Sequence, residues 1–143
     1  MLDDKEMLMR LCSRAEFSRE FLADIKGSAD DEKLRKLLEK QKDSYSFLAS
    51  CARHTLAKRG VTDVSPVSKR RKGDVPKFGN TANMALWKCE RDLEELEGEV
   101  REYKKSDYDR NVAALANDAI DAEKRNVEAL RDILAGDHFS ENG

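Results

Sequence analysis

Apolar residues recur at alternating steps of three and four positions between residues 82 and 103. The positions in this series are Leu86, Cys89, Leu93, Leu96, Val100 and Tyr103. That spacing places them along one stripe of an α-helix, with charged residues on the remaining faces. Because such a helix is stable mainly when its stripe is buried, the pattern predicts a helix that packs against partner helices.

The same period in three other stretches predicts four helices in all. Their expected bounds are about 5–26, 29–59, 81–105 and 107–135. Gly27 is expected to end the first helix in a left-handed conformation, Ser28 to cap the second, and Gly136 to end the fourth, before a polar tail. Gly98 lies inside the third helix and indicates close contact with a neighbouring helix, because glycine costs about 1 kcal/mol there relative to alanine.

The connection between the second and third helices, residues 60–79, has a different composition. It contains both prolines and three of the seven glycines. The second helix is about 45 Å long at 1.5 Å per residue, and an extended loop of this length can run back along it. The sequence therefore predicts an all-α fold, a single four-helix bundle domain over residues 1–143. Its two antiparallel helix pairs are joined by a long crossover loop.

Composition limits the compartment and the partners. Charged residues make up 39% of the chain and aromatic residues 6%, which is typical of long solvated helices around a modest aliphatic core. The net charge of −2 argues against nucleic-acid binding by the whole surface. No apolar run approaches the roughly 20 residues of a membrane span. The acidic start and the three widely spaced cysteines indicate a cytoplasmic protein with reduced thiols.

Two short segments carry a resemblance to a known family. Residues 121–130 read Asp-Ala-Glu-Lys-Arg-Asn-Val-Glu-Ala-Leu, and the expected second helix places Gln41 and Ser44 three residues apart. The first segment resembles the rubrerythrin-like metal motif of the ferritin-like superfamily, with Glu123 in the glutamate place and Asn126 in the histidine place. The predicted crossover between two helix pairs is also similar to that superfamily's helix arrangement.

The resemblance implies a di-iron site, but this chain lacks the histidines for one. Such a site needs two imidazoles and about four carboxylates. The two histidines are His54, near the end of the second helix, and His138, in the tail, so we expect no di-iron centre and no cofactor. A site made of carboxylates alone stays open, with Glu16 or Glu20 together with Glu123.

Polar residues also interrupt the apolar stripes. Gln41 and Asn126 fall on inward faces, and Ser18 lies on the facing stripe of the first helix. A buried amide without a partner costs about 1–3 kcal/mol, so these groups are expected to bond one another or bound water. We interpret them as a buried polar layer that sets helix register, with a small-ligand or residual metal pocket as the alternative.

Two surface features suggest contacts with partners. An extra apolar row on the first helix, including Phe17 and Phe21, predicts a homo-oligomer, a dimer, formed through that helix. Residues 58–77 carry a local charge of +5, centred on a basic run in the crossover loop. This run is Lys69, Arg70, Arg71 and Lys72. It could bind an anion, a nucleic acid or an acidic partner, or lie solvated along the acidic helices. The near absence of aromatic residues around it argues against nucleic acid.

The leading hypothesis is a non-catalytic, ferritin-like helical bundle that acts as a self-associating interaction or scaffold protein. No phosphate loop or nucleophile–base pair is visible, so an enzyme is not favoured. One alternative is a carboxylate-only metal-binding or oxidative protein of the ferritin-like class. The other is an anion or nucleic-acid binder that acts through residues 69–72.

Overall fold

Four α-helices make up the secondary structure of the computed structural model, which describes residues 2–29, 31–62 and 80–142, with side chains through residue 136. The helices are α1 (Asp4–Lys26), α2 (Glu32–Lys58), α3 (Thr81–Tyr103) and α4 (Arg110–Asn142). No β-strand occurs in these residues, so the prediction of an all-α chain with four helices is confirmed. None of the helices in the described ranges is long and apolar enough to cross a membrane.

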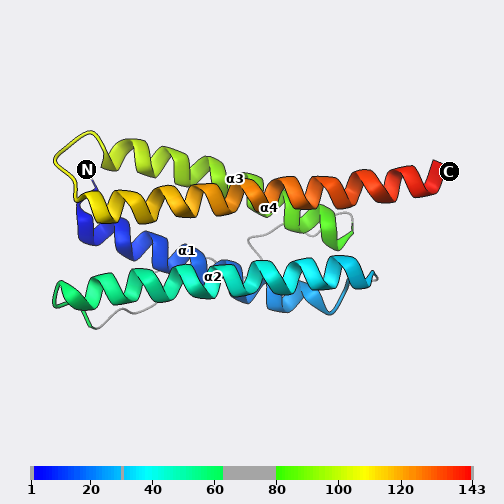
Figure 1. Ribbon diagram of the computed structural model, residues 1–143, viewed down its shortest axis with the longest axis horizontal. Coiled ribbons are helices and arrows are strands. Elements are labelled where there is room, and N and C mark those ends of the chain that lie inside the picture. The colour runs from blue at the N-terminus through cyan, green and yellow to red at the C-terminus, as the bar shows by residue number, and fades with distance from the viewer. Residues whose placement is uncertain (1, 30, 63–79, 143) are drawn as a thin grey trace.

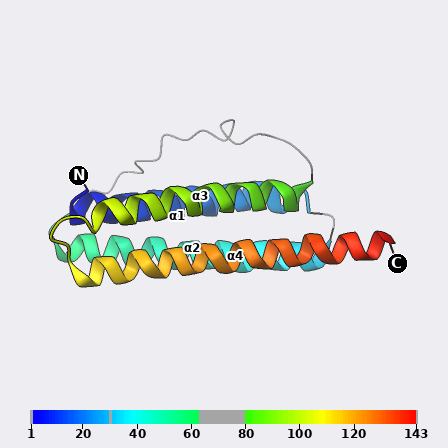
Figure 2. The same cartoon turned by 90° about the horizontal axis from the view of Figure 1, so that it is seen from above.

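The helices form two antiparallel hairpins, α1–α2 and α3–α4, that lie side by side (Figures 1 and 2). The end of α2 lies beside the turn before α4, where Arg59 pairs with Asp109 at 2.7 Å. The start of α3 lies at the opposite end, where Thr81 Oγ1 donates to the Ser28 carbonyl at 3.1 Å. α2 and α3 therefore run in the same direction. Most of the predicted crossover loop, residues 63–79, lies outside the described residues.

Each helix begins at a side chain that accepts hydrogen bonds from the first turn. The caps are Asp3, Asp31, Asn80 and Asp109. The prediction that Ser28 caps the second helix is wrong, because the Ser28 and Ala29 amides bond back to carbonyls at the end of α1. The carboxylate of Asp31 accepts from the Lys33 amide instead, and α2 starts at Glu32.

Two predictions about glycines at helix ends need correction. α1 ends at Gly27 as expected, but with φ −65° and ψ −20° this glycine is right-handed rather than left-handed. The left-handed glycine is Gly60 (φ 83°), where the Val61 amide bonds back to the Leu56 carbonyl at 2.9 Å and closes the end of α2. Gly136 lies inside α4, which continues to Asn142 rather than ending near 135. Glycine can adopt the helical conformation at a cost of about 1 kcal/mol, so one glycine does not end a helix.

The apolar core has two parts, one toward each end of the bundle. The part near the α1–α2 turn includes Phe21, Leu22, Leu34, Leu38, Ala82, Leu130 and Ile133. The other includes Met7, Leu8, Leu56, Leu96, Val100, Tyr103 and Val112. On α3 and α4 buried charged residues, Asp92 and Glu123, lie between the two parts. On α1 and α2 the buried Ser18 and Gln41 lie within the first part, next to this boundary.

Candidate functional site

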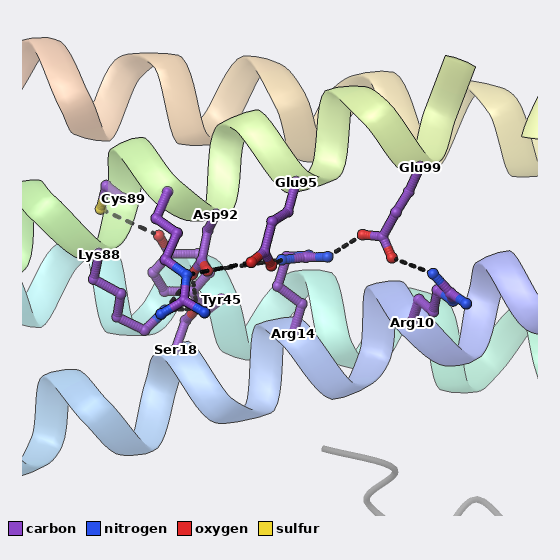
Figure 3. A network of polar contacts seen from close by, with 10 residues as sticks. Arg10, Arg14, Ser18, Tyr45, Lys88, Cys89, Asp92, Glu95 and Glu99 are labelled. Carbon is purple, nitrogen blue, oxygen red and sulfur yellow. Dashed lines mark hydrogen bonds and ion pairs between the residues drawn. The ribbon is translucent and has the colours of Figure 1, made fainter. Parts of the chain in front are cut away.

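Polar and charged side chains from all four helices meet inside the bundle, at or near the boundary between the two apolar parts of the core. The buried members are Ser18 on α1, Gln41 and Tyr45 on α2, Lys88 and Asp92 on α3, and Glu123 and Asn126 on α4. We call this set the polar layer. Arg14 of α1 borders the layer and extends it along the α1–α3 contact (Figure 3). The three side chains expected in such a layer, Ser18, Gln41 and Asn126, all lie in it.

Lys88 is a cation inside the core, and the residue is only 4% exposed. Its Nζ donates to Ser18 Oγ at 2.7 Å and forms an ion pair with Asp92, one helical turn further along α3. The rings of Phe17 and Phe21 cover the ammonium group, with their centroids 5.1 and 5.5 Å from Nζ. A buried charge is tolerated only when it is paired and hydrogen-bonded, and this one is both.

The environment of Lys88 corrects the prediction for Phe17 and Phe21. Phe21 is 7% exposed and belongs to the core, and Phe17 packs against the same part of it. The second apolar row on α1 therefore covers a lysine of the chain's own bundle. The burial of Phe21 removes the observation on which self-association through α1 was based.

Arg14 links the polar layer to carboxylates on α3. Its guanidinium lies 3.7 Å from Asp92 and 3.1 Å from Glu95, and it also pairs with Glu99. Glu99 in turn accepts from Arg10 at 2.9 Å, so the contacts follow α1 and α3 toward the end of the bundle (Figure 3). Burial acts against the charge of Arg14, but the carboxylates of Glu99 and Asp92 more than offset this and raise its pKa.

Glu123 is the buried carboxylate of α4, with 2% of its surface exposed. Burial raises the pKa of this carboxyl group to about 7, and the negative charge of Asp92 adds to the shift. A hydrogen bond from Tyr45 and the positive charges of Lys88 and Arg14 act in the opposite direction. Glu123 therefore exchanges a proton with its surroundings near neutral pH, unlike an exposed glutamate.

The two amides of the layer lie at one level but meet only indirectly. Gln41 Nε2 lies 3.5 Å from the backbone carbonyl of Asn126, and Asn126 Nδ2 donates to the Tyr45 hydroxyl at 3.1 Å. The same hydroxyl lies 3.7 Å from Cys89 Sγ. Tyr45 therefore connects α2 with α3 and α4.

The predicted metal ligands are not brought together. Glu16 pairs with Arg53 at the α1–α2 contact and Glu20 is exposed, whereas Glu123 lies in the core. Across residues 2–29, 31–62 and 80–136, no group of three or more histidine, cysteine or acidic side chains could hold a metal ion. Two carboxylates of the layer, those of Asp92 and Glu123, instead face the protein's own cations.

The thiols near the layer are poor nucleophiles. Burial and the neighbouring Glu16 carboxylate raise the pKa of Cys12 to about 11. Burial and the charge of Glu123 raise the pKa of Cys89 further. Because the thiolate is the reactive form, both cysteines act as packing residues at neutral pH.

Sequence reasoning missed Arg14, Tyr45, Lys88 and Asp92 as members of the site. It placed Leu86 and Leu93 on the buried stripe of α3, but both are only half-buried. The buried positions include Ala85, Cys89, Asp92 and Leu96, a series with the same three- and four-residue steps. That second, equally regular series was the available signal, although it includes the charged residue Asp92.

The remaining predicted residues lie apart from the layer. His54 is exposed on α2, and the basic run 69–72 lies outside the described residues. No protein-family model, curated protein or solved structure matches this chain. The likeness to ferritin-like proteins therefore stays a prediction from a few residues and the order of the helices.

Proposed function

We propose that this chain is a non-catalytic helical bundle of the ferritin-like arrangement that acts as an interaction or scaffold protein. The parallel course of α2 and α3 supports that arrangement, because two hairpins in this orientation need a long connection. The observation that carries the proposal is the buried ammonium group of Lys88. It lies in the same polar layer as Glu123 and Asn126, the two positions that resemble a ferritin-like metal motif.

The charges of the layer suit a metal-free centre. Lys88 and Arg14 bring positive charge to Asp92 and Glu123, which is the electrostatic task of metal ions in a carboxylate site. At an effective dielectric constant of about 20, two unit charges 4 Å apart interact by about 4 kcal/mol, and the repulsion doubles for a divalent ion. A metal ion in this layer would therefore be opposed by the protein's own cations.

The cavity that Arg14, Tyr45 and Glu123 line inside the bundle has a volume of about 20 Å³, which is the size of a single water molecule. The ionic groups turn toward one another across helix contacts, so they fix the register of the helices. A bundle held in this way offers its outer surface, rather than its interior, for recognition.

Metal analysis tests the non-catalytic part of the proposal. The full chain, purified without chelator and titrated with Fe²⁺, Mn²⁺ or Zn²⁺ in a calorimeter, should bind no metal stoichiometrically. Binding of about two ions per chain that is lost in Glu123→Gln would instead support the carboxylate-only metal protein. The matched control is Glu128→Gln, at an exposed position on α4, which should affect only adventitious surface binding.

The proposed role as an interaction protein requires an exposed residue that can contact a partner, and α2 carries one. Phe47 is 69% exposed, whereas Phe17 and Phe21 of α1 are packed against the core. Burying a phenylalanine in a contact contributes about 1.5–3 kcal/mol, and aromatic residues are frequent anchors of interfaces.

Sedimentation of the full chain over a range of concentrations tests whether a second copy makes this contact. Association should weaken in Phe47→Ser and persist in Lys40→Ser, which lies on the same face of α2 two turns away. A wild-type chain that sediments as a monomer at every concentration would contradict self-association.

A further inference from the structure

Three buried side-chain polar atoms lack a hydrogen-bond partner in the described part of the chain: Nε of Arg14 on α1, Oε1 of Gln41 on α2 and Oε2 of Glu123 on α4. In Arg14 and Glu123 the rest of each group is engaged: the terminal nitrogens of Arg14 bind Glu95 and Glu99, and Tyr45 donates to the Glu123 carboxyl group. A buried donor and a buried acceptor both cost free energy when they are left unpaired, so each calls for a partner.

Arg14 and Glu123 line the same small cavity. Its volume is about 20 Å³, and Tyr45 also contributes to its wall. The rest of the lining is apolar and includes Leu48, Leu96, Leu115 and Ala119. A water molecule needs about 10–15 Å³ of such volume, so the cavity has room for one water and for nothing much larger.

We propose that this cavity is a binding site for one ordered water molecule that bridges Arg14 and Glu123. The water oxygen accepts a hydrogen bond from Arg14 Nε–H, and the water donates one hydrogen to Glu123 Oε2. The Tyr45 hydroxyl, at the same cavity, offers a third contact. Buried waters typically make about three hydrogen bonds, and these groups supply that number.

The chemistry of the lining selects water over an ion of similar size. A cation at this point would be repelled by the guanidinium of Arg14, and an anion by the carboxylate of Glu123. Only a neutral molecule that both accepts and donates satisfies the two atoms together. No ion pair within the described residues joins Arg14 directly to Glu123. The proposed water therefore bridges these two residues, and with them the two hairpins.

A crystal structure of the full chain, at a resolution that shows ordered water, tests the site directly. The expected result is one water within hydrogen-bonding distance of both Arg14 Nε and the Glu123 carboxyl group. A dry cavity overturns the proposal, and so does a water that contacts neither atom. This test needs no substitution, so it is independent of whether a variant folds.

Oxygen-17 relaxation dispersion of solvent water provides a second test in solution, because it detects waters that stay buried for long times. The wild type should show such a water, and Ala119→Val, which adds two methyl groups to the cavity wall, should lose it. Ala113→Val is the matched control, buried on the same helix but away from the cavity, and should keep the signal. A signal that is missing from the wild type, or that survives in Ala119→Val, contradicts the proposal.

Discussion

Lys88 and Asp92 are oppositely charged side chains one turn apart on α3, and both are almost completely buried, at 4% and 1% exposure. A pair of this kind contributes little net stability when it is compared with well-packed apolar residues. Removal of one partner, however, leaves a charge in the core without its nearest compensation. The polar layer is therefore more sensitive to single substitutions than to paired ones.

Lys88→Met should lower the free energy of unfolding by about 3–5 kcal/mol, because Asp92 loses its nearest cation. The double variant Lys88→Met/Asp92→Leu should recover much of this loss, since two apolar groups need no partner. Urea denaturation of the single and double variants measures both effects. Lys40→Met, at an exposed position, should stay within about 0.5 kcal/mol of the wild type. Equal effects of the two lysine substitutions would contradict the role of the buried pair.

Glu123 should make stability depend on pH in an unusual direction. Its pKa is raised from 4.5 to about 7 in the folded chain, so the folded state binds the extra proton between these values. Stability is then fully present below pH 4.5 and falls as the pH rises to about 7, by on the order of 3 kcal/mol in total. The measurement is urea unfolding of wild type and Glu123→Gln across this range. The difference between the two proteins should change with this sign, and a constant difference would contradict the assignment.

At the scale of the helices, Gly98 and Gly60 differ in what their backbone positions require. Gly98 lies in the middle of α3, where an added Cβ would meet only the guanidinium of Arg101 on the same helix, at 3.8 Å. The predicted close contact with another helix at Gly98 is therefore wrong. Gly60 has open space around it but a positive φ of 83°, a conformation that other residues rarely adopt.

Gly98→Ala should raise the free energy of unfolding by up to about 1 kcal/mol, because alanine favours the helix and has room for its methyl group. Gly60→Ala should lower it by about 1 kcal/mol or more, because the left-handed conformation strains the new side chain. Thermal unfolding monitored by circular dichroism compares the two. Opposite shifts of the midpoint are expected, and a loss in both variants would mean that Gly98 is needed for packing after all.

The observed helix bounds show which local sequence signals were sufficient to predict where a helix begins or ends. The caps at Asp3, Asp31, Asn80 and Asp109 are all residue types that accept hydrogen bonds from a first turn. The hydrophobic periodicity was sufficient to predict that the four helices exist and in which order they follow. It did not predict their ends. Both Ser28 and Asp31 are residue types that could cap α2, and the helix-forming residues on both sides of Gly136 allow α4 to continue through it. Only the complete set of backbone hydrogen bonds resolves such competition.

For the whole molecule, a buried hydroxyl takes part in the contacts that close one end of the bundle. Tyr103 of α3 is fully buried, and its hydroxyl donates to Asp4 of α1 at 2.5 Å and accepts from the Asp109 amide before α4 at 3.2 Å. Arg59, just after α2, pairs with both Asp4 and Asp109. These contacts join all four helices where α1 and α4 begin.

Tyr103→Phe should lower the free energy of unfolding by about 1–3 kcal/mol, because the Asp109 amide loses an acceptor and Asp4 a donor. The transition should remain a single cooperative step, since the apolar ring still fills the core. Urea unfolding followed by both fluorescence and circular dichroism checks this. Tyr108→Phe is the control at a 43% exposed ring and should be neutral. Separate transitions by the two probes would show that the end of the bundle unfolds independently.

The sequence alone determined that this chain forms four helices with a mainly aliphatic core, because helical period and capping depend on residues only a few positions apart. It also indicated Ser18, Gln41 and Asn126 as inward polar positions. Only the tertiary structure decided that Asp92 rather than Leu93 faces the core. The two positions differ by one residue in equally regular series, and the choice depends on Asp92 meeting Arg14 of α1, in addition to Lys88 one turn earlier on α3. The raised pKa of Glu123 likewise reflects burial and the negative charge of Asp92 on α3, which no local pattern in the sequence contains.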